Sequence, residues 1–426
     1  MLHFSLFSDL NADAVWASIT TTFGEIAPYF PVAIAGTIVW ALWFYRFFLS
    51  RLARPIESDF RTTTSVIVPS YHEDPIILMR CLRSWLSQNP TEIIIVLDVA
   101  DTEAYQQIVE LADPRVQAIL FHHVGKRSAL GVGIREATSE LLVLTDSDTS
   151  WEPGLIENVQ KPFIDPSVGG TSTQQNVYQR DSSLWRRIAD WLVDLRYYDY
   201  VPAMGRAGAV PCLSGRTAVY RRAAVLPVLD NLENEFFLGR RCVAGDDGRL
   251  TWLVLASGYR TVHQSSAKAV SMFPAGLGAF IKQRVRWSRN SYRCYLTAIA
   301  KGWLWRTPFI TKVTVLQILL TPVTMGLTIF YLIFTRLELT TWGIVAVVVF
   351  AFTLTASEFI YALVFISPTT EKVVSTGIPT ALIRGDVFFW QSLEASTVLI
   401  AVPIALVFNM FLARFISGFT MGAVKG

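Results

Sequence analysis

The sequence of 426 residues has few charged side chains for its length. Asp, Glu, Lys and Arg make up 17% of it, whereas hydrophobic residues make up 52% and aromatic residues 13%. Soluble proteins usually carry about 25% charged residues, so this composition excludes an ordinary soluble protein and predicts a chain that lies partly in a bilayer. The net charge is only +3, and the basic residues form no stripe, so we expect no nucleic acid as a partner.

Cysteines are also sparse, and the amino terminus lacks positive charge. The cysteines show no CxxC spacing and fall in the part of the chain that we expect in the cytoplasm, so we expect neither a disulfide nor a zinc site: Cys81, Cys212, Cys242 and Cys294. Residues 1–25 contain no Lys or Arg, unlike the start of a cleaved signal peptide. We therefore expect this segment to be retained.

Long apolar runs lie at both ends of the chain. Residues 26–45 carry no charged side chain and, at about 1.5 Å per residue, can cross a hydrocarbon core of about 30 Å. Arg46, Arg51 and Arg54 follow this run and acidic residues precede it, so the positive-inside rule predicts that the chain continues in the cytoplasm. Three later apolar stretches predict further spans near 309–335, 341–367 and 388–416.

These runs divide the chain into five predicted parts. They are an extracytoplasmic segment 1–25, a transmembrane helix 26–48, a cytoplasmic domain 56–270, amphipathic interface helices 271–306 and a membrane bundle of about three spans at 307–426. Glu358 and Glu394 would be costly facing lipid, so we expect them to face the bundle interior, or else to reach the interface. Segment 377–385 could be interfacial or re-entrant.

The cytoplasmic part has the pattern of an α/β domain. Apolar runs predict strands at 65–68, 92–101 and 140–149, with helices at 75–87 and 126–138. This alternation is typical of a mostly parallel, Rossmann-like sheet with helices on both faces, in which ligands bind at the carboxyl ends of the strands.

Polar clusters follow the three predicted strands. They are Tyr71-His72-Glu73-Asp74, Asp98-Val99-Ala100-Asp101 and Asp146-Ser147-Asp148. In the last cluster two carboxylates can reach one divalent cation that also binds a diphosphate, although an isolated cluster of this kind is more often a solvated turn or a helix cap. Gly125-Lys126-Arg127, one helix upstream, offers cations for nucleotide phosphates, although alone it would more often be a solvated helix start.

Three more motifs follow in order: CLSGRTAVYRR (212–222), GDDGRLTWLVL (245–255) and QRVRW (283–287). Together with PSYHED, LDVAD, GKR and DSD, they resemble the motif set of processive family-2 glycosyltransferases, the group of hyaluronan, chitin and cellulose synthases. The resemblance covers about residues 65–295 and the flanking spans. It implies an α/β GT-A domain inserted between transmembrane helices, and an inverting polymerisation of UDP-activated sugars.

In size and layout the chain is most similar to single-chain bacterial hyaluronan or capsule polysaccharide synthases. It departs from hyaluronan synthases at Arg216, where these typically carry Pro, and its final ISGFTMGAVKG lacks their W-G-T-R-like element. The Gly215-Arg216 pair is similar to one in alginate polymerases. The resemblance therefore leaves the sugar open.

The resemblance also implies roles on the donor side. Tyr71, Glu73 and Asp98 should contact the uridine and ribose, and Lys126 should approach the nucleotide. Asp148, with Asp146, should hold Mg²⁺ or Mn²⁺ on the diphosphate.

On the acceptor side, Asp247 should be the general base that takes the proton of the acceptor hydroxyl, with Asp246 the less favoured base. The alternative is that both acids only cap the helix that follows. Three residues should lie near the acceptor: Cys212, Ser214 and Gly215.

In QRVRW, Gln283, Arg286 and Trp287 share one face of a helix predicted at 276–300. Gln283 and Arg286 suit the nucleotide sugar, because a guanidinium can neutralise a departing diphosphate, and Trp287 can stack on the terminal sugar. Trp287 could instead anchor an amphipathic helix at the membrane surface, and the two roles are compatible.

We therefore predict a multi-pass plasma-membrane enzyme that polymerises sugars on its cytoplasmic side and exports the product through its own spans. Its partners would be UDP-sugar donors, the growing polysaccharide acceptor and the lipid bilayer, and a homo-oligomer is compatible with the sequence. Two alternatives are a non-processive transferase that adds one sugar to a lipid carrier, and a transporter or channel with a regulatory nucleotide-binding domain.

Overall fold

A computed structural model describes residues 30–122, 124–335, 383–384 and 387–388 of the chain. The chain divides into two compact units, Met1–Thr321 and Pro322–Gly426. The first unit contains the α/β domain. In the second, the described residues form the end of one helix and a short hairpin of β11 (Ile383–Arg384) and β12 (Val387–Phe388).

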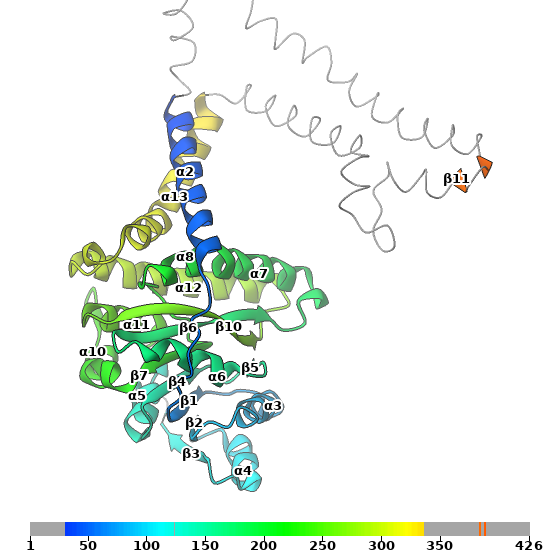
Figure 1. The fold of residues 1–426 in the computed structure, drawn as a ribbon, viewed down its shortest axis with the longest axis vertical. Helices are drawn as coiled ribbons and strands as arrows, with labels where there is room; N and C mark the ends of the chain where they lie inside the picture. Colours follow the sequence, from blue (N-terminus) through cyan, green and yellow to red (C-terminus); the bar gives the residue numbers. More distant parts are fainter. Residues whose placement is uncertain (1–29, 123, 336–382, 385–386, 389–426) are drawn as a thin grey trace, which may run out of the picture. The chain divides into compact units, whose positions relative to one another are not determined.

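The centre of the first unit is an eight-stranded sheet with the order β3-β2-β1-β4-β7-β6-β10-β5 (Figure 1). Parallel pairs join β1 to β2 and β4, β2 to β3, and β6 to β10. Antiparallel pairs join β7 to β4 and β6, and β5 to β10. The strands are β1 (Thr64–Ser70), β2 (Glu92–Asp98), β3 (Val116–Phe121), β4 (Leu141–Thr145), β5 (Thr149–Trp151), β6 (Val168–Val177), β7 (Thr217–Arg221) and β10 (Arg260–Ser271).

Helices cover both faces of this sheet. One face packs against α3 (Pro75–Leu86), α4 (Thr102–Leu111) and α6 (Leu155–Gln160). The other packs against α5 (Lys126–Glu136), α7 (Leu184–Asp194), α8 (Val201–Arg206), α9 (Arg222–Val225), α10 (Leu229–Glu233) and α11 (Asp246–Ala256).

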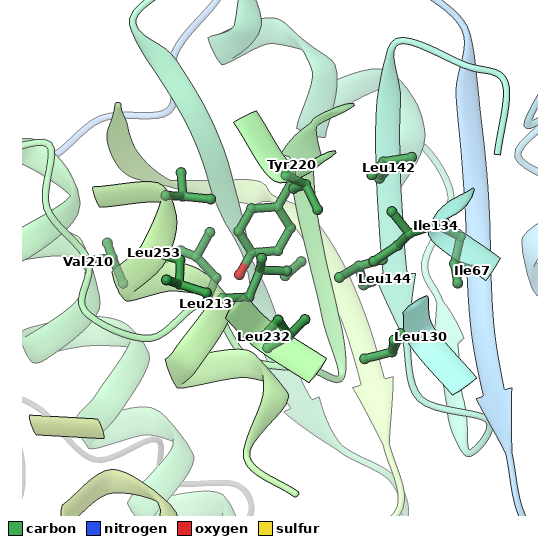
Figure 2. Packing of buried hydrophobic residues seen from close by; sticks show 14 of the residues in the cluster. Ile67, Leu130, Ile134, Leu142, Leu144, Val210, Leu213, Tyr220, Leu232 and Leu253 are labelled. Carbon is green, nitrogen blue, oxygen red and sulfur yellow. The ribbon is translucent and has the colours of Figure 1, made fainter. Parts of the chain in front are cut away.

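The strand alternation explains these two cores. Val66 and Val68 of β1 belong to the core under α3, whereas Ile67 between them belongs to the core under α5. Figure 2 shows the second core, where Leu130 and Ile134 of α5 lie among side chains of β1, β4 and β7. Because both faces are buried, the central strands need the continuous apolar runs seen in the sequence.

The predicted elements are present. The strands predicted at 65–68, 92–101 and 140–149 are β1, β2 and β4, and the helices predicted at 75–87 and 126–138 are α3 and α5. Local chemistry sets the start of α3, where the Asp74 carboxylate accepts a hydrogen bond of 2.8 Å from the Ile76 amide and Pro75 occupies the first helical position. The prediction of a mostly parallel α/β sheet is confirmed.

Three longer helices frame the domain: α2 (Phe30–Leu52), α12 (Leu277–Ala300) and α13 (Phe309–Thr335). Helix α2 contacts the first part of α13, before Pro322 (Figure 1), and the buried Arg46 joins them, because its Nη2 donates 2.6 Å to Gln317 Oε1. The Arg46 guanidinium also stacks on the ring of Tyr200, 4.0 Å from its centre.

Helix α13 contains the one segment of the described residues, Phe309–Leu327, that is apolar and long enough to cross a membrane. The helix predicted at 276–300 is α12. Several predictions lie outside the described residues, namely the segment 1–25, the spans at 341–367 and 388–416, and the placement of Glu358 and Glu394. The predicted division into domains remains a prediction.

Candidate active site

A cavity of about 270 Å³ lies where the motifs meet, beyond the carboxyl end of β4. Side chains from the turn after β4, the segment before β7, the first turn of α11 and the middle of α12 form its walls. The structure brings most of the predicted site residues together here: Lys126, Asp146, Asp148, Cys212, Ser214, Gly215, Asp246, Asp247, Gln283, Arg286 and Trp287.

Lys126 joins the two acidic motifs of this cavity. Its Nζ lies 2.6 Å from Asp146 Oδ1 and 3.2 Å from Asp246 Oδ2. Burial alone would lower the pKa of the ammonium, but the carboxylates, Asp146 foremost, outweigh it and raise the pKa above its ordinary range. Lys126 therefore stays charged and holds the DSD turn against the start of α11.

The DSD turn has the chemistry of a cation site. Burial foremost, together with the charges of Asp146 and Glu73, raises the pKa of Asp148 to about 6, against the opposing effect of Arg216. A divalent cation would relieve the repulsion between Asp146 and Asp148, and carboxylate oxygens are ligands that Mg²⁺ and Mn²⁺ prefer. The two side chains therefore fit such a cation. The described residues contain no group of three or more His, Cys, Asp and Glu side chains that could hold a metal, so further ligands would come from a diphosphate or water.

Asp247 lies in the first turn of α11 and is half-buried, facing the cavity. Burial and the adjacent Asp246 raise the pKa of its carboxyl, against the opposing effect of Lys126. Its Oδ1 also accepts a hydrogen bond of 2.8 Å from the Gly248 amide, so the capping alternative describes part of what this side chain does. Oδ2 stays on the cavity side, 3.6 Å from Cys212 Sγ.

Cys212 contributes a neutral thiol to the wall beside Asp247. Burial and the Asp247 charge raise the pKa of this thiol well above its ordinary value. A thiol that resists ionisation is a poor nucleophile, so the chemistry of this cavity rests on its carboxylates.

Trp287 lies between two arginines. The Arg216 guanidinium is 4.8 Å from the centre of its ring system and that of Arg284 is 4.9 Å away, while the Phe273 ring packs edge-on at 6.1 Å. Burial foremost, together with repulsion from Arg216 and Arg196, lowers the pKa of Arg284 to about 10. The guanidinium groups of Arg196, Arg216 and Arg284 therefore repel one another, and an anionic ligand would relieve this repulsion.

Three predicted donor residues lie beside the cavity rather than in its wall. Glu73 accepts a hydrogen bond of 2.9 Å from the hydroxyl of Ser147, so it touches the DSD turn. Asp98 accepts one of 2.9 Å from the Ala100 amide at the end of β2. Tyr71 is half exposed, and its ring packs against that of His72, with the ring centres 4.2 Å apart and the planes tilted by 52°. All three lie at the carboxyl ends of β1 and β2, next to the cavity residues of β4.

The prediction that Arg127 serves the nucleotide phosphates is wrong. This side chain is 1% exposed and forms an ion pair of 2.7 Å with the buried Glu235. It also donates to the carbonyl oxygens of Leu232 and Gly245. Lys126 faces the cavity, whereas its neighbour points into the protein, because successive residues of a helix differ by about 100° in direction.

The structure adds residues that the sequence motifs did not single out. Arg196 and Tyr197 line the cavity from a π-helical turn, η4 (Leu195–Tyr200), and Arg196 donates 3.0 Å to the Cys212 carbonyl. Such turns often occur at functional sites, but their hydrogen-bonding pattern cannot be read from a sequence. Arg216 and Arg284 lie within two of the motifs, so the sequence could have identified them as candidate site residues.

Comparison with known proteins decides the family. Residues 61–290 match the family described as "Glycosyltransferase like family 2". The chain belongs to this family. The predicted enzyme class, a glycosyltransferase, is therefore confirmed.

Curated relatives of this glycosyltransferase are named N-acetylglucosaminyltransferase. The protein from Sinorhizobium fredii is 34% identical over 56% of this chain and 59% of its own length. That from Rhizobium leguminosarum bv. viciae is 33% identical over 58% of this chain and 60% of its own length. The match thus spans about three fifths of these relatives. Their names refer to N-acetylglucosamine transfer and not specifically to hyaluronan synthesis.

A solved structure shares the fold. The mannosyltransferase PcManGT from Pyrobaculum calidifontis, in complex with GDP-Man and Mn²⁺, superposes with a TM-score of 0.51 at 22% identity. The match covers 67% of this chain and 78% of that one. The predicted GT-A fold is confirmed.

Proposed function

We propose that this glycosyltransferase is a processive, inverting enzyme that polymerises UDP-activated sugars, with N-acetylglucosamine as the main donor sugar. The observation that carries the proposal is the meeting of the DSD turn, the GDD acids and the QRVRW helix in one cavity. The donor sugar rests on the names of the curated relatives.

In this proposal Asp247 is the general base. Its raised pKa suits a group that must accept a proton from the acceptor hydroxyl at neutral pH. As the proton moves to Asp247, the hydroxyl oxygen bonds to the anomeric carbon. The bond from that carbon to the diphosphate oxygen breaks on the opposite face, and UDP leaves.

The donor diphosphate would lie between Asp148 and the arginines of α12. Mg²⁺ or Mn²⁺ held by Asp146 and Asp148 would neutralise part of the leaving-group charge. Arg286 and Gln283 would hold the diphosphate, because guanidinium and amide groups donate several hydrogen bonds. Tyr71, Glu73 and Asp98 would contact the uridine and ribose from the adjacent strand ends.

The acceptor would lie on the Trp287 side, with Cys212, Ser214 and Gly215 beside it and Asp246 as the supporting acid. An indole that stacks on the terminal sugar can hold the polymer between rounds of transfer, and this supports processivity. The apolar segment of α13 supports a membrane location, and export of the product through the chain's own spans completes the proposal.

A donor screen tests this function. The purified chain, in detergent with Mn²⁺, would be given UDP-GlcNAc, UDP-Glc, UDP-GlcA and GDP-Man singly and in pairs, and nucleotide release and product size would be measured. UDP-GlcNAc alone should give polymer.

Other outcomes would change the assigned product. A requirement for UDP-GlcA as well would indicate a hyaluronan-like product, and a requirement for UDP-Glc with UDP-GlcA would indicate a capsule polymer. A product with one added sugar would support the non-processive alternative. Nucleotide binding without sugar turnover would contradict the proposed catalysis and support the alternative of a regulatory nucleotide-binding domain.

Two variants test the assigned residues. Asp247→Asn should abolish UDP release while UDP binding remains, whereas Asp59→Asn, at an exposed position outside the cavity, should leave turnover unchanged. Trp287→Ala should shorten the product, with Trp305→Ala at an exposed tryptophan as the control. Full-length polymer from the Trp287 variant would contradict the acceptor assignment.

A further inference from the structure

A second cavity, of about 430 Å³, lies apart from the GDD acids and the DSD turn. The end of α2 and the segment after it form one wall, and η4, α8, β6 and β10 form the others. None of the motifs assigned to sugar transfer contributes a residue to it, although Tyr197 of η4 lines both cavities.

This cavity is strongly basic. Four arginines line it, namely Arg51, Arg54, Arg206 and Arg260, and no carboxylate does among the residues that the structure describes. Arg260 has a counter-charge outside the cavity, since its Nη1 lies 3.0 Å from Asp165. Like charges around one hollow repel each other, so an anion inside it would be attracted by all four.

Two buried side chains at this cavity have nitrogen atoms without a hydrogen-bond partner. Gln174 is 5% exposed and His263 is 8% exposed, and the Nε2 atom of each lacks a partner. A buried polar group left unpaired is destabilising, and a bound ligand that accepts its hydrogen bond would remove this penalty. When the Ser172 hydroxyl donates to His263 Nδ1 over 2.8 Å, the imidazole Nε2 carries the proton and can donate to a ligand oxygen.

These groups together match one kind of ligand. Guanidinium groups and neutral N–H donors arranged around one hollow suit a group with several charged oxygens, which phosphate has and chloride lacks. Arg51 lies in the last turn of α2 and Arg54 just after the helix, the level at which lipid headgroups would lie if α2 enters a bilayer.

We propose that this cavity binds a phosphate group, supplied by the headgroup of an anionic phospholipid. The site is separate from the proposed transferase chemistry. A free phosphate offers the same oxygens, so the experiment below separates the two sources.

Binding is measured on the full chain. In one arm, the chain in phosphatidylcholine nanodiscs is titrated with fluorescent phosphatidylglycerol. In the other, the chain in detergent receives inorganic phosphate, and the rise in its melting temperature reports binding. Saturable phosphatidylglycerol binding supports the lipid source. If inorganic phosphate alone binds with the same affinity as the lipid, the ligand is the free ion and the lipid source is overturned.

Variants separate this cavity from general surface attraction. Arg51→Gln/Arg54→Gln should weaken binding about tenfold or more, since each basic group near a membrane contributes substantially to headgroup attraction. Arg240→Gln/Arg241→Gln removes the same charge at an exposed pair on β9 (Arg240–Arg241) and should change affinity less than about twofold. Gln174→Glu places a carboxylate at the cavity and should abolish binding.

The outcomes decide the proposal. An equal loss of affinity in the two double-arginine variants would overturn it, and so would full binding by a folded Gln174→Glu variant. The absence of saturable binding in both arms would overturn it as well. If Gln174→Glu fails to fold, the comparison of the two exposed arginine pairs decides alone. Because neither arm measures sugar transfer, failure of this site leaves the proposed function untouched.

Discussion

The Nη2 atom of Arg127 donates a hydrogen bond of 2.9 Å to the carbonyl oxygen of Gly245. This contact joins the start of α5 to the residue that precedes the GDD acids. The same guanidinium pairs with Glu235, which also pairs with Arg249 at 3.3 Å. A buried network therefore holds the turn with Asp246 and Asp247 on its protein side, while Lys126 holds it on the cavity side.

Removing Arg127 should destabilise the domain. Arg127→Met would leave Glu235 buried with one of its two cationic partners gone, and breaking a buried pair in this way costs about 3–5 kcal/mol. Thermal melts of the purified chain should show a clear fall in melting temperature. Arg135→Met on the same helix removes an exposed pair and should cost about 1 kcal/mol or less, so equal effects would contradict the role of the network.

Lys126→Met should lower turnover more than stability. Loss of the ammonium removes the attraction that opposes the raised pKa of Asp247, so that pKa should rise further. The acidic limb of the pH–rate profile would then move to higher pH, and kcat should fall on the order of 10²-fold. UDP release measured against pH checks this. Lys161→Met, which loses only a surface pair with Glu57, should keep the original profile.

Gly245→Ala tests the backbone before the acids. Gly245 has φ +73°, a conformation that costs an L-residue about 1–2 kcal/mol, and an added Cβ would lie 2.8 Å from Asn290 Cγ. Both stability and turnover should fall. Gly258→Ala carries the backbone cost alone, because its φ is +92° and no atom lies within 4 Å of the added Cβ, so its turnover should stay normal. If both variants lost the same turnover, crowding of the new Cβ against α12 would not be the cause of the loss in Gly245→Ala.

Stability should fall between pH 6.5 and pH 4 because of His263. Burial lowers the pKa of this imidazole from 6.5 to about 4 in the folded chain. Below pH 6.5 the imidazole of His263 binds a proton in the unfolded chain but not in the folded chain. Unfolding therefore becomes more favourable, by up to about 3 kcal/mol near pH 4.

Melting temperatures of the wild type and of His263→Gln across this window test the assignment. The variant has no titrating group at this position, so its melting temperature should fall less on acidification. The other ionisable side chains that line the cavity are arginines, Tyr197 and Tyr198, types of side chain that ordinarily ionise only far above this window. Parallel curves for both proteins would show that other groups cause the acid loss.

The sequence was informative where burial demands apolar runs and where motifs carry chemistry. Strands β1, β2 and β4 were predicted because their residues are apolar on both faces. Strand β6 was missed because its sequence, VGGTSTQQNV, is polar although it is buried. Its side chains bond to one another and to neighbours, as Gln175 Nε2 does to Thr173 Oγ1 at 2.6 Å, and a local pattern does not reveal such partners.

The site shows the same division. The spacing in QRVRW predicted which side chains share a helix face, and these residues do line one cavity. The role of Arg127 could not be predicted, because its partner Glu235 lies 108 residues further along the chain. Contacts of this length depend on how the sheet folds rather than on neighbouring residues.

The hydrogen bond between Arg46 and Gln317 has a consequence for biosynthesis. Its partners are 271 residues apart, and the ribosome adds about 5–20 residues per second, so Arg46 waits roughly 15–50 s before Gln317 exists. During that interval the Arg46 guanidinium can contact the Tyr200 ring but lacks its acceptor on α13. The contact between α2 and the first part of α13 therefore forms only after the whole α/β domain has been synthesised.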